Sequence, residues 1–244
     1  MLRIPRTRYP VPQCTTRRSN STKSVALQFT RERLRTLLRE TAQPVSVITS
    51  FMPELNLPLL SPSIPKYHGA TLSSFTSIAM DPHPLISFSL RIPSRMATTL
   101  RSASSRKSKS HMVINILSAS QESTAIKFSR PDLYPEPFKF VPYALSEEGL
   151  PVLEESLGAL SCKLLEGSWP LHEMGALDEA DVEEAQPKGP DVFASELFLA
   201  RVVRVESLAQ GGEFDDTRTL PLLYHRRKYT TITSKRLPPH HASQ

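Results

Sequence analysis

The alternation of apolar and polar residues predicts a chain built mostly of short strands. In PLISFSLR, residues 84–91, the apolar Ile86, Phe88 and Leu90 alternate with polar residues. This period of two is expected of a half-buried strand. Similar stretches predict further strands at 44–51, 69–80, 111–118, 156–165 and 194–207, with a short pair around 221–232.

Three segments show helical spacing instead. Phe29, Leu34, Leu37 and Leu38 predict a first helix over about 30–41, and SRMATTLRSAS and ASQESTAIKFS predict two more, at 94–104 and 119–129. Many strands and few helices indicate a mainly β fold with flanking helices, in which a closed antiparallel barrel would remove exposed strand edges.

Charge is concentrated at the start of the chain. The net charge is +6, and six basic residues with no acid precede residue 24, so residues 24–244 are formally neutral. A neutral main part disfavours nucleic acid as a partner. A segment rich in Arg, Ser and Thr predicts a mitochondrial transit peptide over 1–24 and a location in the matrix, and a disordered basic tail without an address is the alternative. The six residues are Arg3, Arg6, Arg8, Arg17, Arg18 and Lys23.

The remaining chain is expected to form one domain over 25–236, followed by a disordered tail at 237–244. An acidic, turn-rich stretch at 173–191 is interpreted as a solvated surface insertion. No apolar run is long enough for a membrane span. Motifs such as GxGxxG, GxxxxGK[ST], HExxH and paired CxxC are absent from the sequence, which disfavours the common nucleotide folds and zinc sites.

The segment HGATLSSFTSIAMDPHPLISFSL, residues 68–90, is unusually rich in hydroxyl residues. It resembles the signature of the flavin reductase-like family, the FMN-binding split barrels, in which Gly-x-Thr-x-x-Ser-Phe-x-Ser precedes an Asp-Pro-Pro-like turn. The segments HMVINILSASQESTAIKFS, GLPVLEESLGALSCKL and PLLYHRRKYTTI follow in the family's order. The sequence is thus similar to that of a fungal-type mitochondrial member, with an antiparallel, Greek-key-like split barrel.

The resemblance implies a flavin site on the hydroxyl-rich strand. It places Ala70 and Thr71 beside the ring edge, and Ser73, Ser74 and Ser77 toward the ribityl and phosphate groups. A strand of this kind offers backbone N–H groups and hydroxyls without filling the space a flavin needs.

Three more residues belong to this predicted site. Ser94 and Arg95 would bind the phosphate at the start of a helix, or serve only as an N-cap serine and a solvated arginine. Phe128 packs either against the flavin or against the barrel.

Other polar residues invite functional interpretations that we weigh against simpler ones. His83 in DPHPL is interpreted as a surface turn residue, and Asn115 as a strand residue with a satisfied amide. The cluster of Arg101, Arg106, Lys107 and Lys109 is interpreted as a solvated loop, although nicotinamide phosphates or nucleic acid are alternatives.

The chemistry implied by the resemblance is hydride transfer from NADH or NADPH to FMN or FAD. Family members typically have Gly-Asp-His before the last long strand, where this chain has Phe193, Ala194 and Ser195. Arg227 stands where glycine is common. The resemblance makes a flavin reductase that supplies a partner oxygenase the leading hypothesis. A non-catalytic flavin-binding or structural protein on the same barrel is the alternative, and the altered triplet at 193–195 favours it. An RNA-associated mitochondrial protein is a third class. The resemblance also implies a homodimer.

Overall fold

The computed structural model describes residues 19–52, 67–165, 169–171, 194–206 and 217–232. The chain divides into two units, residues 1–39 and 40–244. The predicted insertion at 173–191 and the tail at 237–244 lie outside the described residues. No helix among the described residues is long and apolar enough to cross a membrane.

The first unit contains one helix, α1 (Ser19–Arg39). It begins well before the predicted start at 30, because residues 19–29 contain neither proline nor glycine to stop it. Polar contacts run along its surface: Gln28 Nε2 donates to Glu32 Oε1 at 3.2 Å, and the Arg33 guanidinium lies 5.6 Å from the Phe29 ring centroid. Such contacts one helical turn apart support the helix locally.

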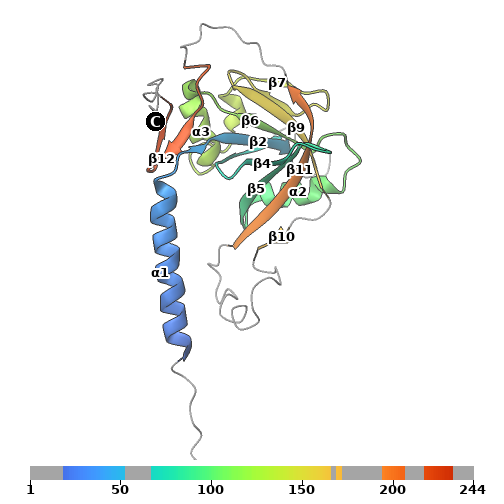
Figure 1. Cartoon of the computed structure of the whole chain (residues 1–244). Helices are drawn as coiled ribbons and strands as arrows, with labels where there is room; N and C mark the ends of the chain where they lie inside the picture. Colours follow the sequence, from blue (N-terminus) through green and yellow to red (C-terminus); the bar gives the residue numbers. More distant parts are fainter. Residues whose placement is uncertain (1–18, 53–66, 166–168, 172–193, 207–216, 233–244) are drawn as a thin grey trace, which may run out of the picture. The chain divides into compact units, whose positions relative to one another are not determined.

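The second unit is built on an antiparallel sheet with the strand order β3-β2-β6-β9-β11-β5-β4, to which β10 adds beside β11. Figure 1 shows its central strands side by side in a strongly curved layer. The strands are β2 (Ser46–Phe51), β3 (Tyr67–Leu72), β4 (Thr76–Ala79), β5 (Leu85–Ile92), β6 (Met112–Ile116), β9 (Gly158–Leu164), β10 (Trp169–Pro170) and β11 (Ala194–Glu206).

Two small sheets flank this barrel. One joins β1 (Gln43–Pro44), β12 (Leu223–His225) and β13 (Lys228–Thr230), and the other is the pair β7 (Tyr143–Leu145) and β8 (Pro151–Leu153). The helical segments of this unit are α2 (Arg95–Ser104), η1 (Ala119–Gln121), α3 (Glu122–Ser129) and η2 (Pro137–Lys139). Most predicted elements are confirmed within a few residues.

Two predictions about the barrel need correction. The expected continuous strand at 69–80 is broken at 73–75 into β3 and β4. The break arises because β3 pairs with β2 whereas β4 pairs with β5, at the other end of the sheet. Within the described residues the barrel is also not closed by a backbone ladder, since β3 and β4 form the two ends of the strand order. It is split between β3 and β4, as the family resemblance implied.

The barrel interior is mostly apolar and is covered by α2. The rings of Phe88 on β5 and Phe198 on β11 stack with centroids 5.4 Å apart and an interplanar angle of 8°. From α2, Met96, Ala97 and Leu100 enter the same cluster. A second cluster around Val45, Leu117 and Phe128 lies under α3. The burial of both clusters is the main driving force for this fold.

Candidate functional site

The hydroxyl-rich strand bends where the sheet is split. At the bend, Ser74 Oγ accepts a hydrogen bond from the Ser89 N–H (3.0 Å) and donates one to the Ser89 carbonyl (2.9 Å). The side chain thus takes the place of a backbone ladder pair and fixes the bend onto β5. The Ser74 hydroxyl therefore supports the shape of the site. The neighbouring Ser73 is half-buried, and Ser77 on β4 is exposed.

Alternate residues of β3 point to opposite faces of the sheet. Ala70 packs against the barrel interior, whereas the Thr71 hydroxyl donates to the Ala125 carbonyl of α3 at 2.7 Å. Thr71 therefore anchors β3 to α3 with its side chain. Its backbone, like that of Ala70, lies in a strand whose only neighbour in the sheet, among the residues that the structure describes, is β2.

Phe128 packs against the barrel, one of the two alternatives that the sequence left open. Its ring is 4% exposed and lies 5.0 Å from the Phe138 ring centroid in an edge-to-face arrangement. The ring covers Gly69 so closely that a Cβ built on Gly69 would overlap it. Glycine is required at position 69 by this close approach, and little of the Phe128 ring is left for a ligand.

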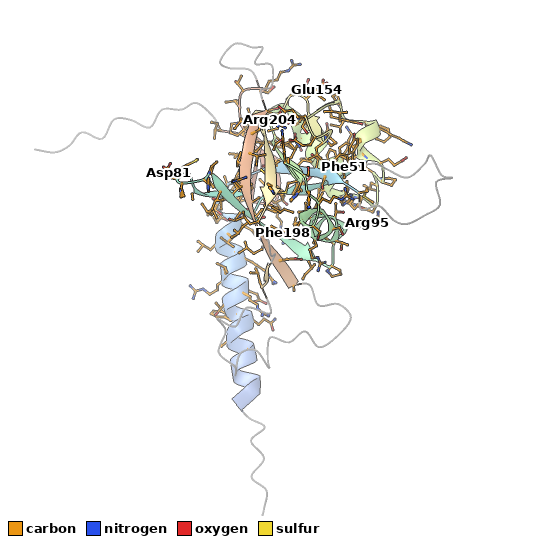
Figure 2. All side chains as sticks on the ribbon, turned by 90° about the vertical axis from the view of Figure 1, so that its right-hand side faces the viewer. Phe51, Asp81, Arg95, Glu154, Phe198 and Arg204 are labelled. Atoms are coloured by element: carbon orange, nitrogen blue, oxygen red, sulfur yellow. The ribbon has the colours of Figure 1, made fainter. Side chains whose placement is uncertain are left out.

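The start of α2 lies beyond the end of β5. Ser94 is its N-cap, with Oγ accepting from the Ala97 N–H at 3.2 Å, and Arg95 is exposed in the first turn. Figure 2 shows Arg95 and Asp81 at opposite ends of β5. The capping role of Ser94 is therefore confirmed, and a helix start with an adjacent guanidinium is a favourable place for an anion.

His68 was missed by the sequence reasoning. It precedes Gly69 on β3, and α2 contacts this strand. Burial and the nearby positive charge of Arg95 both lower the pKa of His68 from its ordinary value. This interaction shows that β3 and the start of α2 lie close to each other.

Glu196 and Arg101 form a second pair that the sequence did not reveal. Arg101 Nε lies 3.8 Å from Glu196 Oε2, and the Glu196 side chain is fully buried. The interpretation of Arg101 as a loop residue is therefore wrong, because it lies on α2 and is paired with a buried carboxylate, although its side chain is exposed to solvent as expected. Only the burial of Glu196 in the folded sheet discloses this role, and no local pattern could have signalled it.

The remaining interpretations can be checked directly. His83 is exposed in the turn before β5, as predicted. Asn115 is buried with its amide satisfied, since Nδ2 donates to the Val47 carbonyl at 3.1 Å and Oδ1 accepts from the Leu153 N–H at 2.8 Å. Burial raises the pKa of the Cys162 thiol to about 12, so this cysteine is unreactive at neutral pH.

Where the family typically has Gly-Asp-His, the structure begins its last long strand. Phe193 lies outside the described residues, and Ala194 and Ser195 are the first residues of β11, paired with Ile92 and Arg91. The Ser195 carbonyl accepts from the Leu171 N–H at 2.9 Å. No imidazole stands at this position.

The arrangement fits the chemical groups of a flavin that carries a phosphate. The outer backbone edge of β3 offers N–H and C=O groups to a ring edge, because β3 ends the sheet within the described part of the chain. The exposed Arg95 and the first turn of α2 offer positive potential to a phosphate. These features define a split-barrel protein in which the start of α2 favours the binding of an anion.

Comparison with known proteins gives the family. The model of the flavin reductase like domain matches residues 38–233, and the chain belongs to this family. A segment of 96 residues is 33% identical to the stachydrine N-demethylase reductase subunit Stc3 of Rhizobium meliloti (strain 1021), covering 39% of this chain. The match spans 38% of that curated relative's length.

Solved structures show the same fold at low sequence identity. Nitrilotriacetate monooxygenase component B from Mycobacterium thermoresistibile superposes with a TM-score of 0.59 at 19% identity, covering 88% of this chain and 93% of the other. The NADH:FAD oxidoreductase SgcE6 of Streptomyces globisporus C-1027, in complex with NAD and FAD fragments, gives 0.57 at 19% identity, covering 84% and 94%. These similarities establish the antiparallel split barrel.

Proposed function

We propose that this protein is an NAD(P)H-dependent flavin reductase. The observation that carries the proposal is the family match over residues 38–233, which includes every element around the split. Flavin supplies a ring that accepts hydride from a reduced nicotinamide. The protein's own task is to hold both rings in contact and to keep the flavin's anionic end in place.

The residues around the split divide this task. The backbone of β3 at Ala70 and Thr71 would bind the ring edge, and Ser73 and Ser77 would line the path toward the phosphate. Ser94 shapes the start of α2, and Arg95 supplies the positive charge. We assign Ser74 and Phe128 to the support of the barrel rather than to flavin contact. Ser74 bonds to Ser89, and Phe128 packs on Gly69.

We propose FMN as the preferred flavin, with FAD as the alternative. A terminal phosphate is a dianion that one guanidinium and a helix start can bind together, and both are present at the start of α2. A steady-state assay of NADH and NADPH oxidation with FMN, FAD and riboflavin as acceptors tests this choice. Faster turnover at low FMN than at low riboflavin supports it, and equal Michaelis constants for all three flavins contradict it.

A non-catalytic flavin-binding protein is the second candidate. One observation favours it: Ala194 and Ser195 occupy positions where the family typically has Asp-His. The same assay separates the two candidates, because a binding protein retains FMN but oxidises neither nicotinamide above the rate of free flavin.

The acceptor of the reduced flavin is proposed to be a partner oxygenase. This rests on two similar proteins, the reductase subunit of a stachydrine N-demethylase and component B of a nitrilotriacetate monooxygenase. Reduced flavin reacts with oxygen, so an oxygenase that captures it should lower the hydrogen peroxide formed per nicotinamide oxidised. A candidate oxygenase that leaves this ratio unchanged is not the partner.

We also propose that the protein is a homodimer, as the family resemblance implies, and that it is located in the mitochondrial matrix. The mitochondrial proposal is supported by the six basic residues before residue 24. Light scattering tests the first part, and a monomer that binds FMN contradicts it. Fusion of residues 1–24 to a fluorescent reporter tests the second, and a reporter that stays in the cytosol contradicts it.

A further inference from the structure

Glu196 places a carboxylate inside the barrel. It lies on the interior side of β11 with Phe198 and Ala200, opposite Leu90 of β5 in the ladder, and its side chain is fully buried. Removing a carboxylate from water carries a large penalty that a nearby cation and hydrogen bonds must offset. An apolar residue would suit this part of the core better, so the acid needs an explanation.

The cation beside it belongs to α2. Arg101 Nε is 3.8 Å from Glu196 Oε2, and the Arg101 side chain is half-exposed, at 51%. The pair therefore links the last turn of α2 to the first residues of β11. The ion pair thus connects β11, a strand of the sheet, with α2, the helix that begins at Arg95.

The apolar contacts of α2 do not fix its orientation by themselves. Met96 and Leu100 are buried in the barrel cluster, but hydrophobic burial is non-directional. An ion pair to one fixed atom restricts how the helix can slide and rotate. Arg95 lies six residues before Arg101, about 9 Å along a rigid helix, so a rotation of α2 moves the guanidinium of Arg95 relative to β3.

We infer that Glu196 is a positioning residue for flavin binding: through Arg101 it orients α2 so that Arg95 and the first turn face the split beside β3. This inference rests on the proposed function, because it assumes that the phosphate of a flavin binds at the start of α2. Ser195, at the position of the family's histidine, has no part in it.

The sign of the effect separates positioning from simple electrostatics. Glu196→Gln removes a negative charge near an anion site, so a pure field effect would tighten the binding of FMN. Positioning has the opposite sign, because the neutral amide releases Arg101 and lets α2 move. We expect Glu196→Gln to weaken FMN binding by about tenfold, as for loss of one well-placed charged contact, and to leave riboflavin binding within about twofold.

The test is a titration of the full chain with FMN and with riboflavin, in which the quenching of flavin fluorescence measures binding. Arg101→Gln should reproduce the loss of FMN affinity, and Arg101→Lys should restore part of it. The double variant Glu196→Gln with Arg101→Gln should bind FMN no more weakly than the single variant with the lower affinity. Glu122→Gln, an exposed acid on α3, is the charge-matched control and should bind both flavins as the wild type does.

Several outcomes would overturn the inference. Unchanged or tighter FMN binding by Glu196→Gln excludes positioning, and equal losses for FMN and riboflavin show a merely structural role. If Glu196→Gln does not fold by circular dichroism, the two Arg101 variants decide, and Arg101→Lys as weak as Arg101→Gln counts against the ion pair. A wild-type chain that binds neither flavin contradicts the proposed function itself, whereas wild-type binding with unaffected variants contradicts this inference alone.

Discussion

Ser74 and Ser89 exchange two hydrogen bonds across the split edge of the barrel, at 3.0 and 2.9 Å, and only one of the two residues contributes its backbone. A side-chain hydroxyl thus continues the β4–β5 ladder beyond the point where the strand bends. The bend is what leaves the edge of β3 open beside α2.

Ser74→Ala should loosen this bend. It removes both hydrogen bonds, and because the site is exposed we expect a loss of about 1 kcal/mol in the free energy of unfolding. Urea denaturation measures it. Ser77→Ala, on the exposed part of β4, is the matched control with an expected change under about 0.5 kcal/mol, and equal losses in both variants would refute the bridging role.

Arg95→Ala should weaken FMN far more than riboflavin. The variant removes a charge-assisted contact to the phosphate, for which about 1.5 kcal/mol or roughly tenfold in affinity is expected. Riboflavin has no phosphate and should bind as before. Isothermal titration of both ligands measures the difference, with Lys107→Ala as a control exposed cation after the same helix. A parallel loss of both ligands would remove Arg95 from the phosphate site.

Gly69→Ala should destabilise the barrel through overpacking. The new methyl group would overlap the Phe128 ring, and relief of such overlap typically costs about 1–3 kcal/mol. At Gly158 an added Cβ meets no atom within 4 Å, so Gly158→Ala is a control free of this overlap. Thermal unfolding of both variants distinguishes them, and combining Gly69→Ala with Phe128→Leu should recover part of the loss.

Stability should fall as the pH drops below about 6.5, partly because of His111. This residue is 4% exposed; Nδ1 accepts from the Leu164 N–H at 3.2 Å, so Nε2 carries the proton and donates to the Arg106 carbonyl at 3.1 Å. Burial, with Lys163 and Arg106 nearby, lowers its pKa from the ordinary 6.5. His68 has a lowered pKa for similar reasons.

The direction follows from proton uptake. Below pH 6.5 these histidines bind protons in the unfolded chain but remain neutral in the folded chain, because their pKa is lowered there. The free energy of unfolding therefore decreases with decreasing pH. Urea denaturation at a series of pH values measures the slope. His111→Gln should reduce the slope in this window, and an unchanged slope would show that His111 does not contribute.

Much of the fold could be predicted from the sequence because its signals are local. The alternation in residues 84–91 and the serine before RMATTL gave β5 and the start of α2 within one residue. The turn between β12 and β13 has no such signal: Arg226 and Arg227 both have positive φ, of 49° and 64°, at positions where glycine or asparagine would mark a turn of this type.

The rest depended on contacts between distant segments. The pattern of residues 69–80 is continuous, and only the exchange of pairing partners from β2 to β5 breaks it. Three-residue strands such as β7 and β8 are too short to show a period. The contact of Phe128 with Gly69 and that of Arg101 with Glu196 join elements whose own sequences predict neither partner.

The most direct test of the central claim is anaerobic reduction of bound flavin. The full chain is loaded with FMN, desalted, and followed by visible absorption after NADH or NADPH is added. Our account predicts a retained flavin band that bleaches with at least one nicotinamide, faster than the same concentration of free FMN. A retained band that neither nicotinamide bleaches would contradict a reductase and leave a flavin-binding protein on the same barrel.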